Sequence, residues 1–187
     1  GREVYRRKFN KGFDGCWMGC ALACAHAVKG FELKTGPFRG QSVYVHGPEY
    51  ETIAGIGSNC GIFDPDYITE MNFYCDTYGL DTISIGTSIA FAMECYELGL
   101  INKRATGGLD LKFGNKEAGL ELLHQMVSGK GFGGGVVGQG IRRMKRIFAE
   151  KYGADPGILN DIGMESKGLE FSEYVTKESL AQQGGYG

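Results

Sequence analysis

The sequence predicts a mainly α-helical protein with little strand. Two segments carry the start signals of helices: Asp64 and Pro65 open one of them, and Asn115 opens the other. Apolar residues recur at helical spacing in residues 138–152, with polar residues between them. A single segment, residues 42–46, alternates as a β-strand does. Helix signals therefore outnumber strand signals along the chain.

The first part of the chain is predicted to be loop, helix, loop and strand. Residues 16–30 are expected to form a loop that turns into a helix ended by Gly30. Residues 31–41 then form a loop. Residues 42–46 combine alternation with β-branched side chains and are a short strand, which Gly47 and the following proline stop.

Four helices are predicted in the remainder of the chain. They are expected to cover Pro65 to about Tyr78, residues 87–98, residues 116–128 and residues 138–152. The second is mostly apolar and should be mostly buried. The basic side chains of the fourth form a solvated face (Arg142, Arg143, Lys145 and Arg146). After Tyr152 the pattern fades into loop.

Composition excludes several classes of protein. The formal net charge of −2 implies neither a nucleic-acid nor a membrane-surface partner. No apolar run reaches the roughly 18 residues of a membrane span. The charged start of the chain lacks the apolar core of a signal peptide. The chain has no initiator Met, so we expect one partial chain, residues 1–187, from the middle of a longer protein.

Three cysteines within nine residues are the strongest chemical signal: Cys16, Cys20 and Cys24. Soft thiolate ligands favour iron–sulfur clusters, zinc or copper(I). On a straight helix Cys16 and Cys24 would lie about 12 Å apart, so binding one cluster requires the segment to bend. The alternative is a buried helix with free cysteines. Such closely spaced cysteines do not resemble a secreted disulfide framework, and a reducing cytoplasm is the expected location.

Two further segments carry polar groups between apolar elements. Glu49 and Glu51 bracket a tyrosine directly after the predicted strand, in Gly-Pro-Glu-Tyr-Glu-Thr. In the loop Gly-Leu-Asp-Thr-Ile-Ser-Ile-Gly, Ser84 or Thr87 is expected to cap the next helix. That would leave the carboxylate of Asp81 free to accept hydrogen bonds from a donor-rich ring such as a pterin.

The glycine run of residues 131–140 precedes a predicted helix and is similar to a phosphate-binding loop. It lacks the Gly-Lys-Ser/Thr ending of a P-loop and follows no clear strand. We therefore interpret it as a flexible or closely packed turn.

The order of these motifs resembles the tungsten-containing aldehyde:ferredoxin oxidoreductase family. The shared sequence runs from the cysteine-rich loop through Gly-Pro-Glu-Tyr-Glu-Thr, Gly-Ser-Asn-Cys-Gly, Gly-Leu-Asp-Thr-Ile-Ser and Ile-Ala-Phe-Ala-Met-Glu to Lys-Gly-Leu-Glu-Phe. It covers roughly residues 13–185. The resemblance implies the helical middle and C-terminal domains of that family. Residues 1–100 would bind the cluster and the pterin, and residues 101–187 would continue the helical part.

The resemblance also implies cofactors and site residues. A tungsten or molybdenum ion would be held by two pyranopterins beside a [4Fe-4S] cluster. Cluster ligands would be Cys16, Cys20 and Cys24, with a fourth outside this chain. Pterin-binding residues would be Asp81, Thr82, Ser84 and Gly86. Glu49 or Glu51 would face the metal and move protons, since oxidising an aldehyde with water requires a proton acceptor.

The chain departs from the family pattern in two respects. Well-known members space the first two cysteines by two residues, whereas Cys16 and Cys20 are spaced by three. The altered spacing makes a second branch of the family, which reduces benzoyl-coenzyme A, an alternative to be considered. Some members also carry a Glu-x-x-His iron site, and we expect none here, because Tyr74–Tyr78 contains no such motif. In that benzoyl-coenzyme A branch Cys60 or Cys95 would be a candidate metal ligand. Otherwise we expect both to be small buried side chains.

The function implied is aldehyde/carboxylate interconversion, with ferredoxin or an iron–sulfur subunit as the electron partner. Class II benzoyl-coenzyme A reduction is the alternative within the family. An iron–sulfur electron-transfer module without pterin and a structural helical subunit are the alternatives from other classes. The rest of a longer chain and a homo- or hetero-oligomer are further expected partners.

Overall fold

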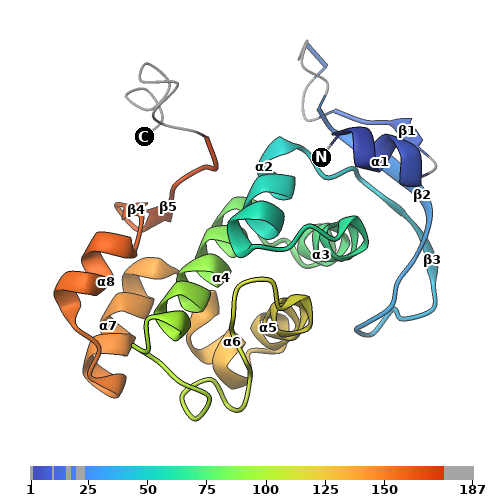
Figure 1. Ribbon diagram of the computed structural model, residues 1–187. Coiled ribbons are helices and arrows are strands. Elements are labelled where there is room, and N and C mark those ends of the chain that lie inside the picture. Colours follow the sequence, from blue (N-terminus) through green and yellow to red (C-terminus); the bar gives the residue numbers. More distant parts are fainter. Residues whose placement is uncertain (1, 10, 16–17, 20–23, 175–187) are drawn as a thin grey trace.

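A computed structural model describes residues 2–9, 11–15, 18–19 and 24–174. It shows a helical body with a three-stranded sheet at one end and a two-stranded hairpin at the other (Figure 1). The main helices are α3 (Pro65–Tyr78), α4 (Thr82–Glu97), α5 (Lys116–Ser128) and α7 (Ile141–Tyr152). The prediction of a mainly α-helical protein is confirmed. No helix in the described ranges is long and apolar enough to span a membrane.

Helices α3 and α5 have the predicted ends because both ends are specified locally. The Asp64 carboxylate accepts the N–H of Asp66 at the start of α3, and Gly79 closes the helix with a φ of 68°. Asn115 accepts the N–H of Ala118 at the start of α5, and Gly129 closes that helix with a φ of 66°. Side-chain caps and left-handed glycines are both encoded within one turn of the helix end.

Helix α4 begins five residues earlier than predicted, at Thr82 instead of residue 87. The cap is Asp81, whose Oδ2 accepts the N–H of Ser84 over 2.9 Å. The expectation that Ser84 or Thr87 provides the cap is therefore wrong, and Asp81 is engaged at one oxygen.

A strand replaces the helix predicted before Gly30. Strand β2 (His26–Glu32) lies between β1 (Lys11–Phe13) and β3 (Ser42–Val45) in an antiparallel sheet. The register shifts between Val28 and Phe31, which allows both of these apolar side chains to be buried. Strand β3 confirms the strand predicted for residues 42–46.

A run of three short helical turns follows β3. Helix α2 (Tyr50–Thr52) continues as a π-helix, η1 (Ile53–Gly57), and then as a 3₁₀ turn, η2 (Ser58–Cys60). The strand does not continue through Gly47, so Glu49 and Glu51 lie at the start of a helix. π-Helical turns are uncommon and often occur at functional sites.

The second half of the chain contains more regular structure than predicted. The glycine run forms helix α6 (Gly131–Gly135) and a 3₁₀ turn, η3 (Val137–Gln139), and α7 begins only at Ile141. A Cβ at Gly133 would lie 2.4 Å from the main-chain oxygen of Leu122, so the glycines bring α6 close to α5.

Regular structure also replaces the loop predicted after Tyr152. The chain forms α8 (Pro156–Ile162) and a hairpin of β4 (Glu165–Ser166) and β5 (Leu169–Glu170). The N-terminal helix α1 (Arg2–Lys8) lies at the other end of the molecule, where the hydroxyl of Tyr5 donates to the main-chain oxygen of Pro65.

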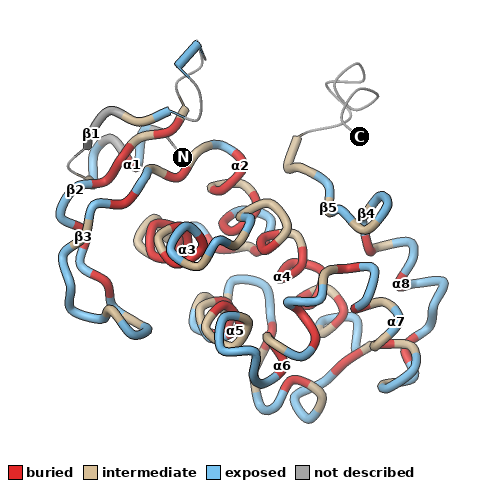
Figure 2. Tube along the Cα trace, turned by 180° about the vertical axis from the view of Figure 1, so that it is seen from behind, coloured by how far each residue is buried: buried red, intermediate tan, exposed pale blue. Residues whose placement is uncertain are grey.

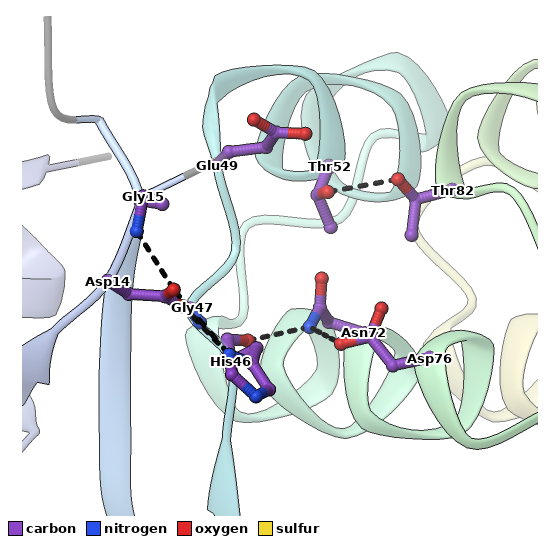
Figure 3. A pocket seen from close by; sticks show the side chains of 10 residues that line it. Asp14, Gly15, His46, Gly47, Glu49, Thr52, Asn72, Asp76 and Thr82 are labelled. Atoms are coloured by element: carbon purple, nitrogen blue, oxygen red, sulfur yellow. Dashed lines mark hydrogen bonds and ion pairs between the residues drawn. The ribbon is translucent and has the colours of Figure 1, made fainter. Parts of the chain in front are cut away.

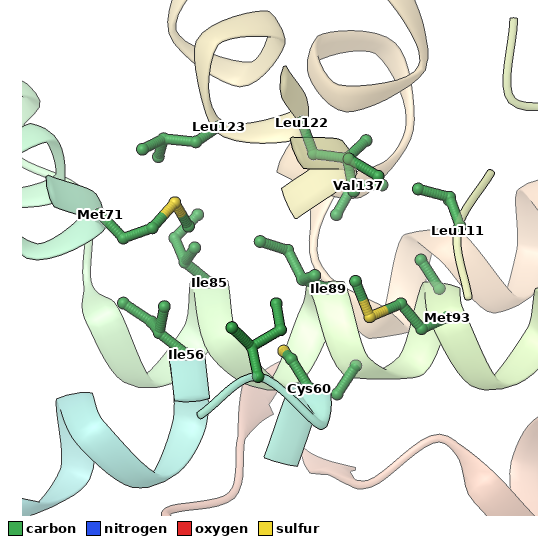
Figure 4. Close-up of a cluster of buried hydrophobic side chains, with 14 of the residues drawn as sticks. Ile56, Cys60, Met71, Ile85, Ile89, Met93, Leu111, Leu122, Leu123 and Val137 are labelled. Atoms are coloured by element: carbon green, nitrogen blue, oxygen red, sulfur yellow. The ribbon is translucent and has the colours of Figure 1, made fainter. Parts of the chain in front are cut away.

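The core lies between η1, α3, α4 and α5. Buried residues line the facing sides of these helices (Figure 2), and their side chains interdigitate (Figure 4). Those with no more than 1% exposure include Ile56, Cys60, Met71, Ile89, Met93, Leu122, Leu123 and Val137. Burying a large aliphatic side chain stabilises the fold by about 1.5–3 kcal/mol, so this cluster holds the surrounding segments in place.

Candidate functional site

A pocket of about 260 Å³ lies where the end of β3, the start of α2, the second half of α3 and the start of α4 meet (Figure 3). Three segments with predicted chemical roles contribute to it. They are the flanks of the cysteine segment, the glutamate motif and the start of α4. The lining residues are Asp14, Gly15, Ala25, His46, Gly47, Glu49, Thr52, Asn72, Asp76 and Thr82.

One wall of the pocket is built around Asp14. Its carboxylate accepts the N–H of Gly47 over 2.7 Å and that of Gly15 over 2.8 Å, and it lies 3.4 Å from Nδ1 of His46. Gly47 passes so close to β2 that a Cβ there would lie 1.8 Å from the main-chain oxygen of His26. Asp14 thus ties the cysteine segment to the exit of β3, and a glycine is required at that exit.

The opposite wall comes from helix α3. Asn72 Nδ2 donates to the main-chain oxygen of His46 over 2.8 Å and to Asp76 Oδ2 over 2.9 Å. Partial burial raises the pKa of Asp76; His46 and Asn72 oppose the shift, and the carboxylates of Asp14 and Glu49 add to it. Three carboxylates therefore face a shared space, which suits a ligand that donates hydrogen bonds.

A hydrogen bond between two threonines joins α2 to α4 beside the pocket. The hydroxyls of Thr52 and Thr82 lie 3.0 Å apart (Figure 3). Behind them η1 and α4 approach backbone to backbone, since a Cβ at Gly86 would lie 2.5 Å from the carbonyl carbon of Gly55 in η1. This backbone contact therefore fixes the distance between the segment that carries the glutamate motif and the start of α4.

Glu51 lies in the chain between the pocket-lining Glu49 and Thr52, is not itself among the lining residues and is only 8% exposed. Its Oε2 accepts the N–H of Glu173 over 2.7 Å, whereas Oε1 is buried with no hydrogen-bond partner among the described residues. Burial raises the pKa of Glu51; the N–H of Glu173 opposes this shift, and the charges of Glu49 and Asp81 add to it. Glu51 therefore holds a proton more readily than an exposed glutamate does.

Apart from Glu51 and the cysteines, the predicted site residues fall into three groups. Glu49 and Thr82 line the pocket. Asp81 and Ser84 make the cap of α4, next to the pocket-lining Thr82, and Gly86 is buried against Gly55 with no room for a side chain on that face.

The cysteine triplet is described only in part. Cys24 is half-buried, carries a free thiol and precedes the pocket-lining Ala25. Cys16 and Cys20 lie outside the described residues, so their role as cluster ligands stays a prediction. A half-buried free thiol beside the pocket fits the donor type of an iron–sulfur cluster.

Several polar groups at the site were not predicted. Asp14 lies two residues before Cys16, and Asp76 lies one turn before the glycine that ends α3, so position beside a predicted motif was the available signal. Glu173 lies 122 residues from Glu51, and nothing in the local sequence connects them.

The other cysteines behave as buried side chains. Cys60 Sγ donates to the main-chain oxygens of Gly55 (3.4 Å) and Gly86 (3.6 Å). Burial raises the pKa of the Cys75 and Cys95 thiols to about 12. These thiols are protonated at neutral pH and are poor nucleophiles.

The expectation that the chain lacks a Glu-x-x-His motif is wrong, because Glu121 and His124 in α5 have this spacing. His124 Nε2 lies 3.0 Å from the hydroxyl of Thr35, which in turn donates to Glu70 Oε1 over 2.6 Å. The Thr35 hydroxyl thus links His124 and Glu70 within a structural network. Within the part of the chain that the structure describes, no three or more His, Cys, Asp or Glu side chains gather as a metal site.

Comparison with known proteins identifies the family of the chain. The family profile described as "Aldehyde ferredoxin oxidoreductase, domains 2 & 3" matches residues 1–187. A tungsten-containing aldehyde ferredoxin oxidoreductase of Pyrococcus abyssi is 40% identical over 109 residues, which cover 57% of this chain and 18% of that protein. The enzyme of the same name from Pyrococcus furiosus is 36% identical over 141 residues, covering 75% and 22%.

A third relative has a different name. The aliphatic sulfonate oxidoreductase, WOR-like subunit, of Pyrococcus furiosus is 34% identical over 162 residues, which cover 87% of this chain and 24% of that protein. The chain thus spans less than a quarter of the length of each of these relatives. Because the family profile matches the whole chain, the chain belongs to the aldehyde ferredoxin oxidoreductase family.

Proposed function

We propose that this chain is part of the catalytic subunit of a tungsten-bispyranopterin, [4Fe-4S] oxidoreductase that interconverts aldehydes and carboxylic acids. The observation that carries the proposal is the pocket, because Glu49 and Thr82 line it together with the flanks of the cysteine segment. Ferredoxin or an iron–sulfur subunit would be the electron partner, and the reducing cytoplasm the location.

The residues present fit the proposed pterin. A pterin ring donates several N–H hydrogen bonds, and the pocket offers acceptors in the carboxylates of Asp14, Glu49 and Asp76 and in the hydroxyl of Thr82. Asp81, the exposed neighbour of the pocket-lining Thr82, caps α4 with Oδ2, and its other carboxylate oxygen is available as a further acceptor. We propose that these groups hold one side of the pterin and that the rest of the longer chain supplies the other.

The residues near the cysteine segment fit a cluster less completely. Cys24 supplies one thiol, and Cys16 and Cys20 are proposed as further ligands on the strength of the resemblance. When bound, the tungsten and the cluster would supply the two-electron chemistry.

The protein groups would handle protons and exclude water. Glu49 lines the pocket and is placed to exchange protons with solvent, whereas Glu51 is buried and shielded from it. Because burial raises its pKa, Glu51 is suited to accept a proton at a higher pH than an exposed glutamate does, and to return it.

Reduction of benzoyl-coenzyme A remains the second candidate, favoured by the three-residue spacing of Cys16 and Cys20. The sulfonate-linked name of one relative adds an aliphatic sulfonate to the substrates to be tested.

The test uses the full-length protein purified without oxygen. Metal analysis that finds tungsten with iron supports the proposal. Iron alone supports the electron-transfer module instead, and neither metal supports a structural subunit. Parallel assays with an aldehyde, benzoyl-coenzyme A and an aliphatic sulfonate then identify the substrate. Glu49→Gln is expected to lower kcat by about 100-fold, whereas Glu32→Gln, an exposed glutamate in β2, serves as the matched control.

A further inference from the structure

The carboxyl group of Glu51 is held at one oxygen and unpaired at the other. The N–H of Glu173 fixes Oε2 at 2.7 Å, and Oε1 is buried with no hydrogen-bond partner among the described residues. A buried, unpaired carboxylate oxygen is costly, whereas a proton on that oxygen removes the charge. Oε1 is therefore the atom of Glu51 at which a proton is most stable.

The residue that fixes Oε2 is itself firmly anchored. Glu173 Oε1 accepts hydrogen bonds from the hydroxyl of Thr87 in α4 (2.8 Å) and from Nδ2 of Asn59 in η2 (3.2 Å). The hydroxyl of Tyr50 in α2 donates to its main-chain oxygen over 2.9 Å. Glu173 thus contacts three separate elements around Glu51.

The surrounding segment forms a strap, defined as residues 171–174, that crosses from β5 to α2. The ring of Tyr174 lies 5.4 Å from that of Tyr50, and Thr87 also donates to the main-chain oxygen of Phe171 over 3.3 Å. These contacts connect the strap to the helices that carry the glutamate motif and the α4 loop.

We propose that Glu173 is a positioning residue for Glu51. Its main-chain N–H fixes Oε2, so that Glu51 takes up and releases its proton at Oε1. On release, the O–H bond at Oε1 breaks, the electron pair stays on Glu51 and the proton passes to a water molecule. The N–H of Glu173 then stabilises the carboxylate that is left. This proposal rests on the proton-transfer role of Glu51 given under the proposed function.

The environment of the two glutamates agrees with Glu51 as the proton carrier and Glu173 as the positioning residue. Burial raises the pKa of Glu51 against the opposing effect of the Glu173 N–H, and Glu49 and Asp81 raise it further. Burial also raises the pKa of Glu173; Thr87 and Asn59 oppose that shift through their hydrogen bonds, and the charge of Glu51 adds to it. Since burial is the largest cause for Glu51, opening the strap should lower its pKa even though an N–H donor is lost.

The experiment compares two substitutions in the full-length holoenzyme. Glu173→Ala removes the acceptor for Thr87 and Asn59 and should release the strap, whereas Glu173→Gln keeps an oxygen that accepts the same bonds. The pKa of Glu51 is read from the infrared band of its protonated carboxyl group, which is assigned by its loss in Glu51→Gln. Steady-state kinetics supply kcat and KM separately.

We expect Glu173→Ala to shift the Glu51 titration to lower pH and to lower kcat by about tenfold or more with KM unchanged. Glu173→Gln should restore most of the original Glu51 titration and most of the original kcat. Thr87→Val, which removes one anchor, should give a smaller shift in the same direction. Thr77→Val serves as the matched control. The exposed Thr77 donates within its helix to the main-chain oxygen of Phe73, as Thr87 does to that of Ile83, but among the described residues it makes no hydrogen bond to the strap.

An unchanged Glu51 titration in Glu173→Ala would overturn the proposal, as would a Glu173→Gln variant that behaves like Glu173→Ala. If Glu173→Ala does not fold, Thr87→Val decides by the same titration. If the protein lacks tungsten and oxidoreductase activity but the titration shifts as expected, the proposed function fails while the positioning of Glu51 stands.

Discussion

The contact between Gly86 and Gly55 predicts the effect of one methyl group. In Gly86→Ala the new Cβ would lie 2.5 Å from the carbonyl carbon of Gly55 and 2.8 Å from its Cα and its oxygen. All three atoms are main chain, so no side chain can rotate away. Overpacking of this kind costs about 1–3 kcal/mol, and rigid surroundings favour the upper end of that range.

A gain in helix propensity offsets part of this cost. Alanine is about 1 kcal/mol more favourable than glycine inside a helix, and Gly86 lies within α4. The expected net loss is therefore about 2 kcal/mol of unfolding free energy, measured by equilibrium urea unfolding of the full-length protein. Gly135→Ala is the matched control, because no atom lies within 4 Å of a Cβ there. A Gly86→Ala variant as stable as the parent would refute this account of the helix contact.

Two further predictions concern charged groups at the ends of elements. Asp81→Ala should cost about 1 kcal/mol of stability through loss of the cap on Ser84, measured by urea unfolding, and Asp81→Asn should retain most of it. The N–H of Gly168, helped by Lys145, holds the pKa of Glu165 below its usual range. The stability contributed by Glu165 is then present above the unfolded pKa of about 4.3 and is lost as pH falls through the lower folded pKa. In Glu165→Gln this acid-dependent part of the unfolding curve should disappear; an unchanged pH dependence would contradict it.

The elements predicted correctly are those whose ends are specified by neighbouring residues. Asp64 and Gly79 define α3 within one turn at each end, and Asn115 does the same at the start of α5. No comparable local signal exists for β2, because its register depends on pairing with β1 and β3. The glycine-rich helix α6 was missed for a similar reason, since its stability depends on close packing against α5.

The candidate site likewise contains residues that local motifs identify and residues that depend on distant parts of the chain. Glu49 and Thr82 were identified from motifs, and the fold places both at one pocket. The cap made by Asp81 was missed because Ser84 and Thr87 are equally acceptable capping residues by sequence alone. Glu173 could not be predicted, because its partner Glu51 lies 122 residues away and the hydrogen bond uses a main-chain N–H, which every residue but proline carries.

The position of Gly55 has a consequence for how this protein can evolve. Its backbone touches Gly86, and a Cβ at Gly55 would lie 3.3 Å from Oε1 of Glu173. A larger residue at this one position would therefore disturb both the packing of α4 and the anchor of the strap. Selection for higher stability and selection for higher catalytic activity would therefore act on the same position. A randomised library at Gly55 should contain few variants that improve stability or activity without lowering the other.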